Sequence, residues 1–464
     1  MIKKGILTGL NLFFIALFCL ALFVFFSARP AWNIEEVVRD SALKEKKFGG
    51  KVAEITSDNG VKAWFMEEHD APLVALSFYF DNAGYAFDDD DKQGLASFVS
   101  YMLPRRAGDF DEHGFQTLLE TNAVKIRFDV ADDIFEGALT FPKANVGKAA
   151  DVLKLILTKP NTDEKNMEVV KRQQIAMIEM QNERPENVLR NEFRKRFFAN
   201  HPKGRLAIGV KENVADFSKK DLLSFVLKNF GKDNLTVALV GDMTQDEAKR
   251  FLDDVFANLP NNGSHEIQAP VEAQYRMKED NIERDIPQVI SLFVAKGVVR
   301  SDADFYPLYI ANEIFGGSGL SSRLNKRARE KEGLTYGAYT YLNTDKDAPR
   351  LMGTFSASYD NYEKMRSILL EEWQKMARKG VKKEEFESIR NNMLKSFNLR
   401  FDSLENISKQ LLYMQKEHLE IDFLQKRNEY VSKTSFDVVN QAAKKYFANE
   451  PSILTIGHNN KRRD

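Results

Sequence analysis

The sequence predicts an α+β fold of two homologous domains, each an antiparallel sheet covered by helices, after an N-terminal apolar segment. Three observations lead to this prediction. The chain has 464 residues, whereas a single hydrophobic core rarely grows beyond roughly 250–300 residues. A segment of the first half recurs in the second half, as expected of a duplicated domain. Strand-like and helix-like segments do not alternate strictly, which is typical of antiparallel sheets covered by helices.

The composition is that of a globular protein and excludes several functional classes. Hydrophobic residues make up 43% of the chain and charged residues 29%, which excludes a disordered or collagen-like protein. The net charge of -1 gives no general attraction for a phosphate backbone, so we expect no nucleic-acid partner. The single cysteine, Cys19, excludes an intrachain disulfide and a thiolate zinc cluster.

The N-terminal segment predicts export. Lys3 and Lys4 precede residues 6–26, which contain no charged side chain and are long enough to span a membrane as a helix. We expect residues 1–33 to be a signal anchor and residues 6–26 to hold the chain at the inner membrane, with the remainder in the periplasm. Small residues within 26–31 leave open the alternative of a cleaved signal peptide and a soluble periplasmic or secreted protein.

The internal repeat defines the domain organisation. Residues 214–230 read as a capped amphipathic helix, and a β-branched strand ending at a glycine follows. Residues 431–447 and the strand after them repeat this order about 216 positions later. Residues 259–270 are rich in turn formers and predict a linker. The predicted domains are therefore 45–258 and 271–464.

Other segments of both halves predict strands followed by long helices. Strands are expected at 73–80 and 289–295, and helices at 163–182, 362–380 and 382–400.

Residues 94–103 read Gly-Leu-Ala-Ser-Phe-Val-Ser-Tyr-Met-Leu and place an apolar stripe on one face of a helix. This segment resembles the zinc helix of the pitrilysin/insulinase family of metallopeptidases, in particular its short two-domain bacterial members. The resemblance extends over nearly everything after about residue 45. In that family the helix contains an HxxEH motif. Its two histidines bind zinc, and its glutamate is the general base for the attacking water.

The resemblance also implies that this motif is degenerate here. Ser97 and Tyr101 stand at the histidine positions, and Ser100 stands at the position of the base. Met177 falls where the family has its third zinc ligand. Glu179 lies two residues further on, which is about 200° around a helix, so it is a poor substitute. We therefore expect no metal bound by this chain.

No other part of the sequence predicts a zinc site. The six histidines include no pair at a spacing of three or four residues, so each is expected on the surface or in a loop. The acidic run at residues 88–91 predicts a solvated turn before the helix rather than a calcium site.

The second half closely resembles the second-domain signature of the same family. Phe315-Gly316-Gly317-Ser318-Gly319 opens a segment that reaches Arg329 and Tyr336. In the family this arginine and tyrosine project across a closed chamber, hold the substrate backbone and stabilise the developing oxyanion. The resemblance implies the same roles for Arg329 and Tyr336. The stretch Gly316, Gly317, Ser318 and Gly319 is expected to let a peptide backbone pass close to the chain. On their own, Arg329 near a helix end and Tyr336 in a strand would be ordinary structural residues.

Together these features predict a non-catalytic, substrate-binding subunit of a heterodimeric zinc metallopeptidase. A homologous subunit with an HxxEH motif would hold the zinc, and this chain alone would be inactive. The substrates would be extended peptides that add a strand to a sheet edge inside the chamber. The alternative is an architectural or peptide-binding protein with no peptidase role.

Overall fold

The computed structural model describes residues 49–278, 280–397 and 401–457. They belong to one compact unit. The predicted membrane segment, residues 6–26, lies outside the described residues. Within the described part of the chain, no helix is both long and apolar enough to cross a membrane.

The first half is built on a six-stranded sheet with the order β1-β2-β6-β3-β5-β4. Its strands are antiparallel except for the parallel pair β2 and β6. The strands are β1 Val52–Thr56, β2 Lys62–Glu67, β3 Leu73–Asp81, β4 Lys125–Val130, β5 Ile134–Pro142 and β6 Leu235–Gly241. The chain's predicted strand at 73–80 is therefore confirmed.

The second half repeats this topology in a five-stranded sheet with the order β7-β11-β8-β10-β9. The pair β7 and β11 is parallel and the other pairs are antiparallel. The strands are β7 Asp280–Glu283, β8 Val289–Lys296, β9 Ala338–Asn343, β10 Arg350–Ala357 and β11 Ser452–Gly457. Five strands thus occupy equivalent positions in the two sheets, which confirms two homologous domains. Residues 259–270, between them, form neither helix nor strand.

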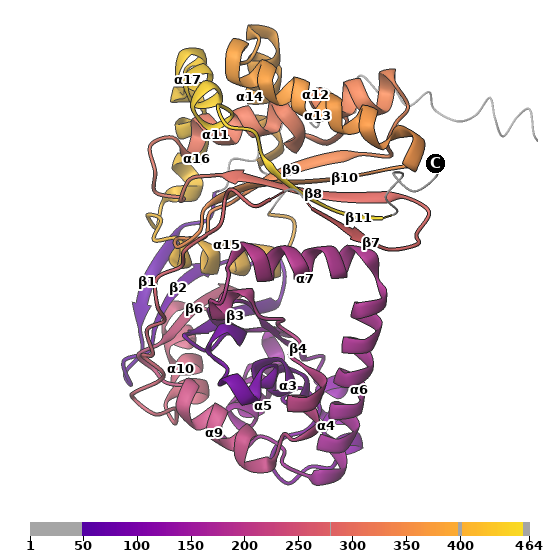
Figure 1. The fold of residues 1–464 in the computed structure, drawn as a ribbon. Coiled ribbons are helices and arrows are strands. Elements are labelled where there is room, and N and C mark those ends of the chain that lie inside the picture. Colours follow the sequence, from indigo (N-terminus) through magenta and orange to yellow (C-terminus); the bar gives the residue numbers. More distant parts are fainter. Residues whose placement is uncertain (1–48, 279, 398–400, 458–464) are drawn as a thin grey trace, which may run out of the picture. The chain divides into compact units, whose positions relative to one another are not determined.

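Helices cover both sheets (Figure 1). Those of the first half are α3 Leu95–Met102, α4 Glu112–Thr121, α5 Val146–Thr158, α6 Glu164–Glu183, α7 Pro185–Phe197, α8 Lys211–Ala215, α9 Lys219–Asn229 and α10 Gln245–Phe256. Those of the second half are α11 Phe305–Asn312, α12 Arg323–Asn325, α13 Tyr359–Lys379, α14 Lys383–Ser396, α15 Leu404–Lys416, α16 Phe423–Lys433 and α17 Phe436–Tyr446. The long helices predicted from the sequence correspond to α6, α13 and α14.

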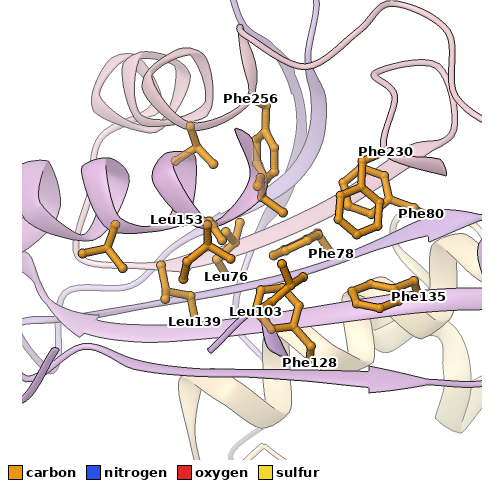
Figure 2. Close-up of a cluster of buried hydrophobic side chains, with 14 of the residues drawn as sticks. Leu76, Phe78, Phe80, Leu103, Phe128, Phe135, Leu139, Leu153, Phe230 and Phe256 are labelled. Carbon is orange, nitrogen blue, oxygen red and sulfur yellow. The ribbon is translucent and has the colours of Figure 1, made fainter. Parts of the chain in front are cut away.

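The repeat extends to individual side chains. Ser218 caps α9 and Ser435 caps α17, each by accepting a hydrogen bond from a backbone N–H of the first turn. In the sheets, Phe78 lies opposite Gly137, and Phe293 lies opposite Gly353. A Cβ at either glycine would lie about 2 Å from the facing phenyl ring, so only glycine leaves room for it. Figure 2 shows Phe78 among the other buried side chains of the first core.

Each half contributes one helix to the sheet of the other half. Helix α15 packs on β3 and β6 of the first sheet through an apolar cluster that contains Leu411 and Val240. The hydroxyls of Ser77 and Ser408 are hydrogen-bonded there at 2.8 Å. Reciprocally, α7 packs on β8 and β11 of the second sheet, on the side opposite α13 and α17 (Figure 1). Folding of the two halves is therefore coupled through buried apolar surface.

Candidate functional site

Helix α3, where the degenerate motif lies, is fixed by a buried carboxylate. Asp88 is only 6% exposed, and its oxygens accept hydrogen bonds from the N–H groups of Gly94 at 2.8 Å and Ala96 at 3.0 Å. The prediction of a solvated turn at residues 88–91 is thus wrong for Asp88, which satisfies N–H groups at the start of α3. It is correct for Asp89, Asp90 and Asp91, which are exposed.

The charge state of Asp88 predicts a pH dependence of stability. Burial raises the pKa of Asp88 from 3.8 to about 7, although the N–H donors at Gly94 and Ala96 oppose this shift. The folded chain therefore binds this proton more tightly than the unfolded chain. The resulting stability is fully present below pH 3.8 and is lost as the pH rises through about 7. Between pH 4 and pH 8, the melting temperature of the native chain should fall relative to that of Asp88→Asn. Asp89→Asn, at an exposed position, should follow the native chain, whereas parallel curves for Asp88→Asn and the native chain would contradict this assignment.

The residues at the family's zinc-binding positions are already hydrogen-bonded within the chain or lack strong metal-binding atoms. The Ser97 hydroxyl donates to the Ala207 carbonyl at 2.6 Å, and the Ser100 hydroxyl donates to the Ser97 carbonyl at 2.8 Å. Burial raises the pKa of Tyr101, with a smaller contribution from Asp129, so its phenol stays protonated. Neutral hydroxyls are weak zinc ligands compared with imidazole or carboxylate.

Helix α6 supplies no replacement ligand. Met177, at the third ligand position, is partly buried against the first core. Glu179 pairs instead with Lys211 at 2.5 Å on the surface. Among the described residues, no group of three or more His, Cys, Asp and Glu side chains is arranged to hold a metal ion. The donor set on α3 and α6 therefore does not fit a zinc ion.

Rebuilding the motif tests whether α3 and α6 occupy the family's zinc-site positions. The variant Ser97→His, Ser100→Glu, Tyr101→His and Met177→Glu should retain about one zinc ion per chain after gel filtration, because three strong ligands would then converge. Metal content can be measured by mass spectrometry. The same variant with Tyr101 retained has one histidine fewer and should lose the metal. A folded four-residue variant that stays metal-free would show that these positions do not converge.

A pocket of about 310 Å³ opens beside these residues. Its wall includes Ser97, Ser100 and Tyr101 of α3, residues 128–130 of β4, and polar side chains of α6 and α7. Strand β4 is the last strand of the first sheet, so one edge of its backbone has no neighbouring strand in the sheet. The pocket and this free edge place the degenerate motif next to a surface that can accept an extended peptide.

Arg329 and Tyr336 lie in the second half, where the chain passes from a helix to strand β9. Arg329 belongs to the π-helix Lys326–Lys331, and Gly333, at φ 64°, ends it. Tyr336 precedes β9 and is 81% exposed, so the view of it as an ordinary strand aromatic does not apply. Within the described residues, neither side chain makes a hydrogen bond or ion pair. Both groups are thus available to an external ligand.

The glycine-rich stretch is held tightly by its own surroundings. Asn325 donates to the carbonyls of Gly319 at 2.9 Å and Ala338 at 2.8 Å, which ties the stretch to the start of β9. A Cβ on Gly316 would lie 2.6 Å from Thr340 Oγ1, so this glycine allows close internal packing. Gly319, in contrast, faces open space. A role of Gly316, Gly317, Ser318 and Gly319 in passing a substrate backbone remains a prediction.

The fold and the site define a peptidase-like protein whose zinc helix is degenerate. Residues 216–393 match the family model described as "Peptidase M16 inactive domain". A protein named non-peptidase homolog YmxG, from Helicobacter pylori, is 24% identical over 402 residues, or 86% of this chain and 92% of that protein. The mitochondrial-processing peptidase subunit beta of Lentinula edodes is 21% identical over 344 residues, or 69% of this chain and 72% of that protein.

Among solved structures, the fold is similar to that of the peptidase M16 inactive domain from Pseudomonas fluorescens. The TM-score is 0.81 at 21% sequence identity, over 88% of this chain and 98% of that chain. These findings confirm the resemblance seen in the sequence. In sequence and in fold, the chain is similar to pitrilysin-like M16 proteins that are described as an inactive domain or a non-peptidase homolog.

Proposed function

We propose that this chain is the non-catalytic, substrate-binding subunit of a heterodimeric zinc metallopeptidase. One combination of observations supports this most strongly. The motif positions on α3 hold hydroxyls, two of them bonded to backbone carbonyls, whereas Arg329 and Tyr336 are exposed and have no partner within the described chain. A purely architectural subunit would have no need for an exposed guanidinium and an exposed phenol without partners in the described chain.

In this proposal, the partner is a homologous chain with an HxxEH motif that binds the zinc ion. The bound zinc would activate water and polarise the scissile carbonyl. Arg329 and Tyr336 would donate hydrogen bonds to the peptide and to the oxyanion that forms during attack. The name of the Lentinula edodes relative, a peptidase subunit, is consistent with assembly of related chains.

Extended peptides are the proposed substrates. The free edge of β4 can pair with a peptide backbone, and the pocket beside it can receive a side chain or terminus. The apolar segment at residues 6–26 supports a periplasmic location at the inner membrane.

Association with the partner tests this proposal. The full chain in detergent and the HxxEH-bearing homologue encoded in the same genome should elute together as a one-to-one complex in size-exclusion chromatography. A stable homodimer of this chain that does not associate with the homologue would contradict the proposal. That result would favour the alternative, an architectural or peptide-binding protein with no peptidase role.

A further inference from the structure

We propose that the pocket beside α3 binds the carboxylate group of a peptide that lies along the free edge of β4. This inference rests on the proposed function, which places an extended peptide at the free edge of β4, and it deepens that proposal by naming the chemical group that the pocket binds. It assigns a ligand chemistry to the place where related peptidases hold a metal ion.

The pocket wall contains several hydrogen-bond donors that have no partner within the described chain. The wall includes Tyr101 of α3, Gln181 of α6, and Arg190 and Asn191 of α7. Within the part of the chain that the structure describes, none of these four side chains makes a hydrogen bond or ion pair. A phenol, two amides and a guanidinium all donate hydrogen bonds, and a carboxylate accepts several at once.

The charged side chains in the pocket wall leave one positive charge without a partner. Asp129 is the carboxylate in the wall, and Arg127 pairs with it at 3.0 Å. Arg194 also lines the pocket, but it is engaged by Asp132 at 3.6 Å and by the Tyr85 hydroxyl. Arg190 therefore remains as an uncompensated positive charge. It would supply to a bound anion the attraction that a zinc ion supplies in an active peptidase.

The pocket lies directly beside the free edge of β4. Phe128, Asp129 and Val130 belong both to β4 and to the pocket wall. A peptide paired with the free edge of β4 therefore passes the pocket with its backbone already fixed. The pocket volume of about 310 Å³ is at the lower end of the roughly 300–1,000 Å³ range of ligand sites. It suits a small group such as a terminal carboxylate better than a large side chain.

Binding of matched peptides to the full chain in detergent tests the proposal. The probe is a fluorescein-labelled octapeptide of alternating threonine and alanine with a free C-terminal carboxylate, and binding is followed by fluorescence anisotropy. Its C-terminal amide should bind about tenfold more weakly, because the charge-assisted hydrogen bonds are lost. A third peptide, amidated and with one internal glutamate, carries a side-chain carboxylate in place of the terminal one. Tighter binding of the free-carboxylate peptide or of the glutamate peptide than of the plain amide agrees with the proposal.

Variants show whether Arg190 provides the selectivity. Arg190→Gln should bind the carboxylate and amide peptides with affinities within about twofold, while amide binding is unchanged. Arg172→Gln removes an exposed arginine from α6 outside the pocket and should keep the preference of the native chain. Equal binding of all three peptides by the native chain, no binding of any of them, or an unchanged preference in Arg190→Gln would overturn the proposal. The partner plays no part in this assay, so its result is independent of whether the heterodimer is a peptidase.

Discussion

Replacing Arg329 with alanine is expected to lower kcat of the reconstituted peptidase about 100-fold or more, because loss of one preorganised oxyanion donor costs roughly 10²–10³ in rate. Tyr336→Phe, which removes only a hydroxyl, should have a similar effect. Both side chains are exposed and unpaired within the described chain, so neither change should alter folding. Hydrolysis of a quenched fluorescent peptide by the complex gives kcat and KM.

Matched controls come from neighbouring positions. Lys331→Ala removes an exposed charge from the same π-helix, and Tyr339→Phe removes a hydroxyl from an exposed tyrosine of β9. Both should leave kcat within about twofold of the native value, as usual for surface changes. If the double variant Arg329→Ala and Tyr336→Phe kept full activity while the complex still formed, the catalytic-support role would be wrong.

Replacing Lys203 with methionine is expected to destabilise the fold by about 1.5–3 kcal/mol, since it removes a buried ammonium and its charge-assisted hydrogen bonds to partly exposed carboxylates. The Lys203 side chain is only 3% exposed. Its ammonium lies 3.1 Å from Asp133, 3.3 Å from Asp345 and 2.7 Å from Asp347. Asp133 belongs to the first half and the other two belong to the second half. Lys203 therefore joins the halves electrostatically.

The same cluster fixes the sign of the pH dependence. Burial alone would lower the pKa of Lys203, but Asp345 and Asp133 outweigh it and raise the pKa above its usual value. Burial alone would raise the pKa of Asp345, but Lys203 outweighs it and lowers the pKa. The stability from Asp345 is therefore present above pH 3.8 and is lost as the pH falls through its folded pKa. The contribution of Lys203 to stability is present below pH 10.5 and is lost as the pH rises through the pKa of Lys203 in the folded chain.

Urea unfolding at several pH values measures this effect. The deficit of Lys203→Met should be largest near neutral pH and smaller below pH 3.8, where protonation of Asp345 removes its attraction to the ammonium. Lys211→Met breaks the exposed pair with Glu179 and should cost no more than about 1 kcal/mol. An equal cost for the two variants would show that the ion pairs of Lys203 do not stabilise the junction between the halves.

Much of the fold is predictable because it follows from local patterns. Capping serines, amphipathic periods and β-branched strands mark the repeat, and the structure has them at equivalent positions, as at Ser218 and Ser435. The exchange of α7 and α15 between the sheets is not predictable in this way. It depends on which apolar face each helix meets, and that is decided by packing between segments distant in sequence.

The candidate site is also predictable from the sequence only in part. The positions of Ser97, Ser100 and Tyr101 on a helix follow from the sequence pattern, and α3 is found there. The buried Asp88 looked like part of a solvated acidic turn, because sequence alone does not show that its carboxylate faces the N–H groups of α3. The roles of Lys203 and Arg190 depend on neighbours from other elements. The sequence around Lys203, which follows Pro202, and around Arg190, in a charged helix, does not indicate which residues of other elements lie beside them.

The most direct test of the central claim is zinc content and peptide hydrolysis of the full chain, measured alone and then mixed with the HxxEH-bearing homologue encoded in the same genome. We expect no bound zinc and no hydrolysis by this chain alone. In the mixture, we expect activity well above that of the homologue alone. Stoichiometric zinc together with hydrolysis by this chain alone would show that it is a catalytic peptidase and not a zinc-free subunit.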